Sequence, residues 1–355
     1  MKIQVLHTDV ICSCPDSLHN YFAWPSVAVM QDGSLAAVAS GFRLGHLCPF
    51  GKCVLLRSTD EGRTWSRPTP VIDTPLDDRD GGILPFGESS VMITSFNNTT
   101  ADQRGWNGGK SAYIDAYLDR VEAMEGVHER YLGSTFVLSH DGGVTFSEVK
   151  RIPVTAPHGP CLLNDGQILY VGRTFPRGEG MEEKEDCIRA YLVHPDGSYE
   201  RRGRIENVAP DLLSCEPHAL CLPSGRILVH IRVQGRGVFT TYQSESDDGG
   251  FTFTAPHPLL APTGGAPAHL LRLRSGRLIS VYGYRNPPFG IKVMVSDDDG
   301  ASWDAGHDLY VNHVSPDLGY PATAELKNGD LYTVFYAHPA PTSPAVLMGT
   351  TWRLL

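Results

Sequence analysis

The chain has 355 residues, of which 41% are hydrophobic and 20% are charged, as in an ordinary water-soluble globular protein. Its net charge of -10 argues against nucleic acid or an anionic membrane as a partner. The sequence has no apolar run long enough for a transmembrane helix, and its N-terminus lacks the apolar core of a signal peptide, so we expect a cytoplasmic protein.

The first predicted element is a strand near Ile3–Val10, and six similar segments follow it. Each segment contains an apolar strand, a turn with glycine and a second apolar strand. In chain order they are SVAVMQDGSLAAVASGF, GGILPFGESSVMITSF, GPCLLNDGQILYVGRTF, HALCLPSGRILVHIRV, HLLRLRSGRLISVYGYR and ATAELKNGDLYTVFYAH. A unit that repeats along a chain is typical of architectures in which each unit packs only on its neighbours.

An octapeptide of the form Ser-x-Asp-x-Gly-x-Thr/Ser-aromatic accompanies four of these segments. The copies are STDEGRTW from Ser58, SHDGGVTF from Ser139, SDDGGFTF from Ser246 and SDDDGASW from Ser296. The Asp side chain can accept backbone N–H bonds across a turn, and the Gly supplies a conformation that other residues resist. We therefore expect each octapeptide to be a stapled hairpin turn joining the two outer strands of a four-stranded unit.

These patterns predict an all-β fold, a six-bladed β-propeller with four-stranded antiparallel blades, formed by residues 1–355 as a single domain. The sixth segment lacks an octapeptide, and the strand near Ile3–Val10 can complete its blade and close the ring. A helical insertion in blade 2 is expected at about 104–132. Its apolar residues at helical spacing, expected to pack, are Ile114, Tyr117, Val121 and Met124.

The eight cysteines are scattered, and none forms the paired C-x-x-C knuckles of a structural zinc site. We interpret them as free thiols and expect no metal. The sequence also lacks a dinucleotide fingerprint, a P-loop and a G-x-S-x-G elbow, so no cofactor is expected.

Polar residues stand beside the starts of the innermost predicted strands. They are Trp24, Asp80, His158, Glu216 with His218, His269 and Tyr320. In a propeller these positions surround one mouth of the central channel. Because burying polar groups without partners is costly, a shared ligand site is a reasonable explanation for the whole set.

The octapeptides are Asp-boxes, and the chain resembles the sialidase (neuraminidase) superfamily of six-bladed propellers over nearly its whole length. The segment CEPHALCLPSGRILVHIR is similar to the one in which a Glu begins an inner strand and an Arg ends the next. The resemblance implies that Glu216 is the partner of the nucleophile and Arg232 a carboxylate clamp. GYPATAEL similarly implies a nucleophilic Tyr320, and GYRNPPFGI a second clamp, Arg285.

The same resemblance places Arg43 and Asp80 in the pocket. The chemistry suits these residue types, because a sialoside carries a carboxylate on its reacting carbon and would repel an anionic nucleophile. A tyrosine activated by a Glu avoids that repulsion, and arginine binds a carboxylate bidentately.

Two departures from the family pattern bear on the sugar. Where the family has its first clamp arginine, this chain has Ala23 and Trp24. The loop that carries the family's acid/base aspartate reads RLGHLCPFGK and has no carboxylate. His46 can replace that acid, since histidine titrates near neutrality, and so can an aspartate of the run at 77, 78 and 80.

The sequence thus predicts a retaining exo-glycosidase with a Tyr320–Glu216 pair, acting on a terminal, sialic-acid-like sugar of a carbohydrate substrate. The remaining candidate ligand contacts are Trp24, His158, His218 and His269. Two alternatives stay open at this point. One is a lyase that abstracts a proton from a uronic-acid polysaccharide, and the other is a non-catalytic glycan-binding propeller.

Overall fold

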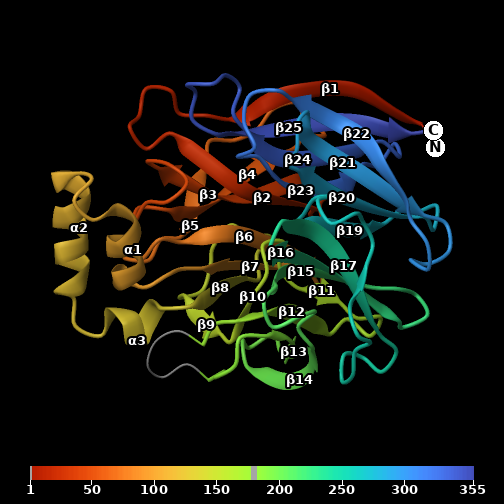
Figure 1. Cartoon of the computed structure of the whole chain (residues 1–355), viewed down its shortest axis with the longest axis horizontal. Helices are drawn as coiled ribbons and strands as arrows, with labels where there is room; N and C mark the ends of the chain where they lie inside the picture. Colours follow the sequence, from red (N-terminus) through yellow and green to blue (C-terminus); the bar gives the residue numbers. More distant parts are fainter. Residues whose placement is uncertain (1, 177–181) are drawn as a thin grey trace.

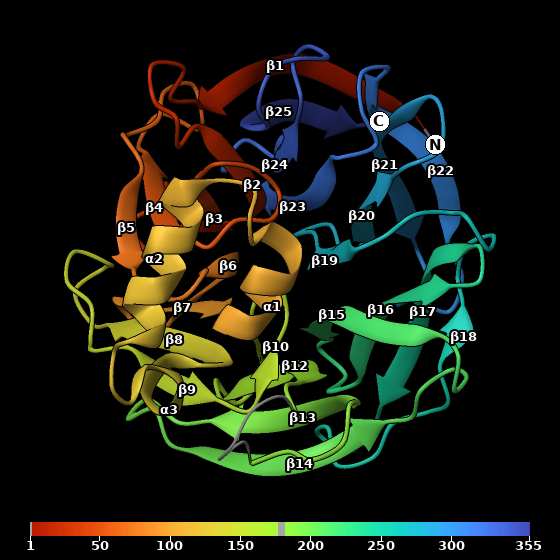
Figure 2. The same cartoon turned by 60° about the vertical axis from the view of Figure 1, so that its left-hand side comes forward.

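The computed structural model describes residues 2–176 and 182–355. In these residues the strands form six antiparallel sheets arranged radially around a channel (Figure 2). The prediction of a six-bladed, all-β propeller is confirmed. No helix in this described part is long and apolar enough to cross a bilayer.

Blades 1 to 3 are contiguous in sequence. Blade 1 contains β2 (Tyr21–Val29), β3 (Leu35–Arg43), β4 (Lys52–Ser58) and β5 (Thr69–Ile72). Blade 2 contains β6 (Arg79–Phe86), β7 (Ser90–Phe96), β8 (Ser134–Ser139) and β9 (Lys150–Ile152). Blade 3 contains β12 (Ile168–Thr174), β13 (Ile188–Val193) and β14 (Tyr199–Ile205), and two short pieces, β10 (Val154–Thr155) and β11 (Cys161–Leu162), replace one inner strand.

Blades 4 to 6 complete the ring. Blade 4 contains β15 (Leu213–Cys221), β16 (Ile227–Gly235), β17 (Val238–Ser246) and β18 (His257–Pro258). Blade 5 contains β19 (Ala268–Arg272), β20 (Leu278–Tyr284), β21 (Phe289–Ser296) and β22 (Asp304–Asn312). Blade 6 contains β23 (Gly319–Glu325), β24 (Leu331–Ala337), β25 (Val346–Leu354) and β1 (Ile3–Cys12).

The N-terminal strand closes the ring, as predicted. β1 pairs antiparallel with β25, with Gln4 opposite Arg353 and Thr8 opposite Thr350. The hydroxyl groups of Thr8 and Thr350 are 2.9 Å apart. The two ends of the chain therefore lie side by side on blade 6 (Figures 1 and 2).

The insertion between β7 and β8 contains three helices in the described chain, α1 (Thr100–Asn107), α2 (Ala112–Glu122) and α3 (Val127–Tyr131). Figure 1 shows them projecting from one face of the ring. α2 buries Ile114, Leu118 and Val121, partly against the loop between β3 and β4. Met124 follows α2 and is 39% exposed, so the expectation that it packs with the stripe is wrong.

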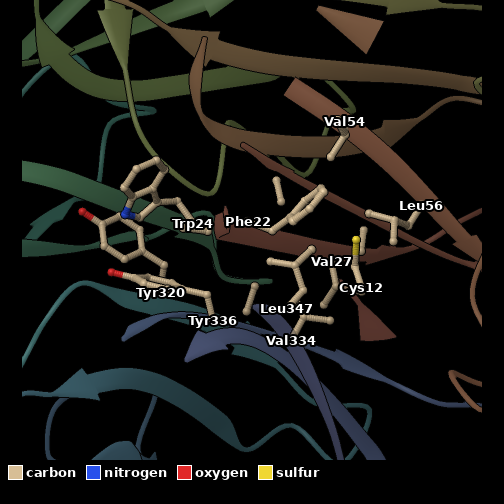
Figure 3. Packing of buried hydrophobic residues seen from close by; sticks show 14 of the residues in the cluster. Cys12, Phe22, Trp24, Val27, Val54, Leu56, Tyr320, Val334, Tyr336 and Leu347 are labelled. Atoms are coloured by element: carbon tan, nitrogen blue, oxygen red, sulfur yellow. The ribbon is translucent and has the colours of Figure 1, made fainter. Parts of the chain in front are cut away.

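Adjacent blades are held together by apolar side chains from their facing sheets. Figure 3 shows the cluster between blades 1 and 6, where Phe22, Val27 and Leu56 of one sheet meet Val334 and Leu347 of the other. The cluster continues toward the channel. Its inner end consists of Trp24, Tyr320 and Tyr336, so the interblade core and the candidate site share a wall.

Each octapeptide forms the predicted staple. In the first, Asp60 Oδ1 accepts from Ser58 Oγ at 2.8 Å and from the Thr64 N–H at 2.9 Å, and Ser58 Oγ accepts from the Gly62 N–H at 2.8 Å. The other three copies repeat this set of bonds. The staple also joins blades, since Trp65 Nε1 donates to the Tyr332 hydroxyl of blade 6 at 3.1 Å.

We predict that Gly62→Ala lowers the free energy of unfolding by about 2–3 kcal/mol. Gly62 has φ +87°, and a Cβ there would lie 2.2 Å from the buried ring of Tyr332. Gly87→Ala is the matched control, because Gly87 also has positive φ (+57°) but faces open space. Denaturant unfolding of both variants checks this, and equal losses would contradict a role for Gly62 in interblade packing.

Candidate active site

Four of the innermost strands carry the same backbone feature near their starts. Trp24, Asp80, Glu216 and Tyr320 have φ of 55°, 47°, 49° and 49°, and a register shift marks each place. The next residue in the chain is Pro in three cases and Gly in the fourth. A non-glycine residue in this region costs about 1–2 kcal/mol, and such strain gathers at functional sites. The same bulge thus marks four blades around one mouth of the channel.

Tyr320, Glu216 and Arg232 form one hydrogen-bonded group. The Tyr320 hydroxyl donates to Glu216 Oε1 at 2.7 Å. Arg232 Nη1 donates to both carboxylate oxygens of Glu216, at 2.8 and 2.7 Å, and to the Tyr320 oxygen at 3.1 Å. The structure therefore brings together three residues that were singled out separately, from β15, β16 and β23.

The phenol of Tyr320 is protonated in this arrangement. Burial and the negative charge of Glu216 raise its pKa well above the ordinary value, although Arg232 lowers it. Because the hydroxyl proton points at Glu216, that carboxylate is the group that can take the proton when the phenol reacts. The pair can thus generate a nucleophilic oxygen only as the proton moves to Glu216.

Asp80 lines a cavity of about 220 Å³ together with Glu216 and the rings of Phe96 and Phe175. Burial raises the pKa of Asp80 to about 7, with Arg79 opposing the rise and Glu216 adding to it. Among the described residues its carboxyl group receives no hydrogen bond. Asp80 therefore offers an unengaged carboxyl to whatever occupies the cavity.

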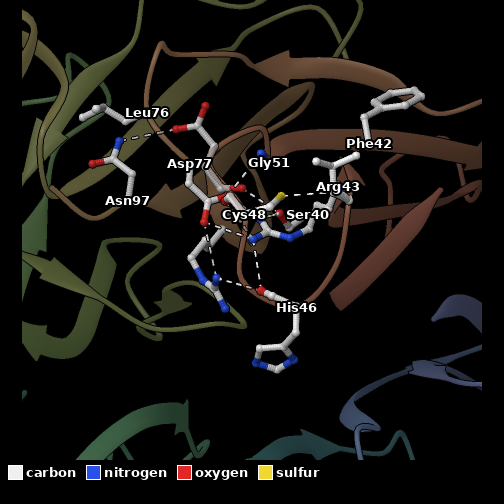
Figure 4. A network of polar contacts seen from close by, with 12 residues as sticks. Ser40, Phe42, Arg43, His46, Cys48, Gly51, Leu76, Asp77 and Asn97 are labelled. Atoms are coloured by element: carbon white, nitrogen blue, oxygen red, sulfur yellow. Dashed lines mark hydrogen bonds and ion pairs between the residues drawn. The ribbon is translucent and has the colours of Figure 1, made fainter. Parts of the chain in front are cut away.

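Arg43 does not serve as a free clamp, which corrects the prediction that it binds substrate. Its side chain is 0% exposed and forms a bidentate pair with Asp77, at 2.5 and 3.0 Å (Figure 4). Its remaining N–H groups donate to Ser40 Oγ and to main-chain oxygens of the following loop. A guanidinium with all its donors satisfied inside the protein has none left for a ligand.

The same contacts rule out two acid candidates of the aspartate run. Asp77 is enclosed and engaged with Arg43, so it cannot reach a ligand. Asp78 is also buried, and its oxygens accept from the N–H and the hydroxyl of Thr74 at 2.7 and 2.9 Å. Of the three aspartates only Asp80 faces the cavity.

Arg79 was missed from the sequence. Its guanidinium lies 4.1 Å from the centre of the Trp24 ring, and that of Arg43 lies 4.8 Å from the same ring. Trp24 itself is 1% exposed and belongs to the buried cluster that contains Tyr320 and Tyr336; its contact with substrate stays a prediction. The run DDRD was visible in the sequence, but nothing in it singled out the arginine from its acidic neighbours.

Arg285 has no internal carboxylate partner among the described residues. Its Nε donates to the Leu318 carbonyl at 3.3 Å, and its guanidinium lies 5.1 Å from the ring of Phe239. The guanidinium of Arg232 lies 4.7 Å from the centre of the same ring, so both arginines pack against Phe239. Phe239, at the start of β17, was also missed. Arg173 lines the cavity with Asp80 and Glu216, and its guanidinium is paired with Asp186.

His46 pairs with Asp317, which was not predicted from the sequence as a site residue. His46 Nδ1 lies 2.9 Å from Asp317 Oδ1, and the His46 ring packs edge-on against Trp24 at 5.0 Å between centroids. Asp317 also accepts from the Tyr21 hydroxyl at 2.7 Å and the Tyr336 hydroxyl at 2.9 Å. This cluster lies on the blade 1 and blade 6 side of Tyr320.

His158, His218 and His269 lie together, but not with Tyr320 and Glu216. Their ring centroids are 4.4 to 5.6 Å apart, and they line a different cavity of about 480 Å³ that lacks Asp80, Glu216 and Tyr320. This corrects the expectation that they share one ligand site with that pair. His218, for example, comes two residues after the bulged Glu216 on β15, so it lies farther along the channel and away from the mouth.

The three imidazoles are neutral. Burial lowers the pKa of His218 to about 3, and those of His158 and His269 also lie well below the ordinary value. His218 Nδ1 accepts the Leu270 N–H at 2.9 Å and His269 Nδ1 accepts the Thr323 N–H at 3.4 Å. His218 and His269 thus act as acceptors that satisfy backbone groups of neighbouring strands, whereas His158 Nδ1 lies 2.9 Å from the Ser26 hydroxyl.

A family model described as a BNR repeat-like domain matches residues 118–333. No protein of curated function matches the chain. Among solved structures, a protein of unknown function from Dyadobacter fermentans is similar with a TM-score of 0.77 and 19% identity, over 99% of both chains.

Two similar structures hold ligands. The leech intramolecular trans-sialidase, complexed with 2,7-anhydro-Neu5Ac, matches with a TM-score of 0.69 and 13% identity over 98% of this chain and 70% of the other. The α-L-arabinanase of Penicillium chrysogenum, complexed with arabinobiose, matches with a TM-score of 0.61 and 12% identity over 98% of both chains. At these identities the likeness establishes the shared six-bladed fold.

The channel histidines predict a pH dependence of stability. Because His218 titrates near 6.5 when unfolded and near 3 when folded, its stabilising effect is complete above about pH 6.5 and is lost progressively as pH falls toward 3. Each such histidine contributes up to about 1.4 kcal/mol per pH unit in that window. Denaturant unfolding between about pH 7 and about pH 5 gives the dependence of the free energy of unfolding on pH. This dependence should be weaker in His218→Asn than in wild type, and the amide oxygen of that variant can still accept the Leu270 N–H. Identical slopes would contradict the assignment.

Proposed function

This chain belongs to the BNR repeat-like domain family, and from that premise we propose that it is a sialidase-like glycoside hydrolase that releases a terminal sugar with retention of configuration. The observation that carries the proposal is the 2.7 Å hydrogen bond from the Tyr320 hydroxyl to Glu216 in a channel mouth. The glycan ligands of the leech and Penicillium structures support a carbohydrate substrate for this fold.

In the first step the Tyr320 oxygen attacks the anomeric carbon while Glu216 takes the phenolic proton, and the bond to the leaving-group oxygen breaks. In the second step water attacks the same carbon, the bond to Tyr320 breaks, and Glu216 returns the proton to the phenol. Two displacements at one carbon restore the starting configuration. Arg232 stays bonded to Glu216 and to the Tyr320 oxygen, so its charge stabilises both as they change.

The sugar is proposed to carry an acid group, as sialic acids do. Arg285 supports this, because it is a cation without an internal carboxylate partner among the described residues, and it lies beside the ring of Phe239, as Arg232 does. Ala23 and Trp24 stand where the family has its first clamp arginine, and Arg43 is neutralised by Asp77. The acid group is therefore held by two arginines in this proposal rather than three.

A proton donor is also needed for the leaving group, and two residues of the site fit that task. Asp80 has a carboxyl with a pKa of about 7, so a large fraction of it is protonated at neutral pH. His46 has an imidazole held by Asp317. Their positions distinguish them, because Asp80 lines the cavity whereas His46 lies in the loop between β3 and β4.

We predict that Tyr320→Phe lowers kcat by about 1000-fold or more on every substrate the wild type cleaves, while the unfolding midpoint stays within a few degrees. Glu216→Gln should have a similar effect. The test uses a panel of aryl glycosides and acidic oligosaccharides, with proton NMR following the configuration of the sugar first released. Tyr199→Phe, which removes a hydroxyl from the outer strand of blade 3, is the matched control.

Four results would overturn parts of this proposal. Full activity in Tyr320→Phe would remove Tyr320 as nucleophile, and a sugar first released with inverted configuration would exclude the covalent route. An unsaturated product from uronic-acid polysaccharides, in place of a released sugar, would identify a lyase. Glycan binding by calorimetry without any product would identify a non-catalytic propeller.

A further inference from the structure

His46 is fixed more firmly than an exposed loop histidine needs to be. It lies in the loop between β3 and β4, and its side chain is 44% exposed. Its main-chain oxygen accepts from Arg43 Nη2 at 3.2 Å and from Arg79 Nη1 at 3.1 Å. Both arginines are bound to the enclosed carboxylate of Asp77. Figure 4 shows this network above the His46 carbonyl and the imidazole pointing away from it.

The ring of His46 is held from a second side by Asp317. Burial raises the pKa of Asp317, but hydrogen bonds from His338 and His46 outweigh this effect and hold the pKa far below the usual range. Asp317 is therefore an ionised carboxylate, which can only accept hydrogen bonds. His46 Nδ1, 2.9 Å away, must then carry the hydrogen of that bond. Among the described residues the other ring nitrogen, Nε2, makes no hydrogen bond to the protein, so it is left for a ligand.

Asp317 is itself immobilised. Besides His46 it accepts from the hydroxyls of Tyr21 and Tyr336 and from His338 Nε2, at 2.7, 2.9 and 3.0 Å. These four donors come from blade 1 and blade 6, on both sides of the ring closure. Tyr336 also packs against Tyr320, with ring centroids 6.1 Å apart, so the cluster is continuous with the nucleophile's surroundings.

The two proton-donor candidates differ in depth. Asp80 is 5% exposed and lies on the cavity wall with Glu216, where it can reach only the deeply bound sugar. The side chain of His46 is 44% exposed, and the Trp24 ring packs against both His46 and Tyr320, with centroids 5.0 and 6.4 Å away. An exo-acting enzyme buries the terminal sugar and leaves the rest of the chain toward solvent. The leaving-group oxygen is therefore nearer the rim than the floor.

We propose that His46 is the general acid that protonates the leaving group and that Asp317 is the positioning residue that holds its ring; this rests on the proposed function. In the first step the proton on His46 Nε2 passes to the glycosidic oxygen as its bond to the anomeric carbon breaks and the Tyr320 oxygen bonds to that carbon. In the second step Nε2 takes a proton from the attacking water. Asp80, on the floor, contacts the sugar instead of the leaving group.

The test is the dependence of rate on the leaving group. An activated 4-nitrophenyl glycoside needs no proton, whereas an oligosaccharide carrying the same terminal sugar does. His46→Gln should lower kcat on the oligosaccharide by about 100- to 10,000-fold and on the nitrophenyl glycoside far less. Azide, which needs no general base, should restore turnover of the nitrophenyl glycoside and give a glycosyl azide of retained configuration.

Asp317→Asn tests the positioning role. This variant should also be slowed more on the oligosaccharide than on the nitrophenyl glycoside, but by a smaller factor than His46→Gln. The change should appear in kcat more than in KM. Nitrogen-15 NMR of the imidazoles, with the His46 signal identified by its absence from His46→Gln, should show hydrogen on Nδ1 in wild type. In Asp317→Asn the hydrogen should shift to Nε2. The new amide N–H groups can donate to His46 Nδ1, which then accepts a hydrogen bond where it donated one to the carboxylate. His194→Gln is the matched control, since His194 pairs with Glu200 on the outside of blade 3.

The outcomes separate this inference from the proposed function. A wild type that cleaves neither substrate overturns the proposed function, and the role of His46 falls with it. An active wild type whose His46→Gln variant is slowed equally on both substrates overturns the inference alone. If Asp80→Asn shows the leaving-group split and His46→Gln does not, Asp80 is the acid. An unchanged tautomer in Asp317→Asn overturns the positioning role.

Discussion

The enclosed carboxylate of Asp77 is the contact on which the pocket depends. It binds Arg43 and Arg79 and also accepts from the side chain of Gln103 and the main-chain N–H of Gly51. These partners belong to blade 1, to the start of blade 2 and to α1, so one charged group ties the inserted helices to the propeller. A buried ion pair is stable only when its hydrogen bonds are satisfied, and loss of one partner costs about 3–5 kcal/mol. The loop that carries His46 takes its conformation from this group.

A second constraint acts on the innermost strands. Trp24, Asp80, Glu216 and Tyr320 each occupy a left-handed backbone conformation that their side chains disfavour. In the described residues, blades 3 and 5 show no such non-glycine residue in their inner strands. In blade 3 the inner strand is interrupted between β10 and β11, and the cavity with Asp80 and Glu216 opens beside that interruption. The four blades with this backbone strain thus place Trp24, Asp80, Glu216 and Tyr320 around the channel mouth. The irregular blade 3 leaves a cavity beside Asp80 and Glu216.

Local patterns made the fold predictable, and long-range ion pairs limited the prediction of the site. The octapeptides and alternating strands are short-range signals, so the blades, their order and the closing N-terminal strand followed from them. Glu216 and Tyr320 were found because each stands beside the start of an inner strand, in a segment that resembles the sialidase family. Arg43 was misjudged because its partner is 34 residues away in the chain and no local pattern reveals that it is neutralised. Asp317 was missed for the same reason, since all four of its donors arrive through tertiary contacts. The channel histidines were placed at the mouth because strand starts alone do not show how far a side chain lies along the channel.

Closure of the ring by β1 has a consequence for how the protein is made. The hydroxyls of Thr8 and Thr350 that meet across the seam are separated by 342 residues of chain. At roughly 5–20 residues per second of synthesis, β1 waits about 20–70 seconds for its partner strand. During that interval its edge is unpaired and open to association with other nascent chains. Because Tyr320 belongs to the blade that is completed last, its contact with Glu216 forms only after the strands of the other five blades have been synthesised.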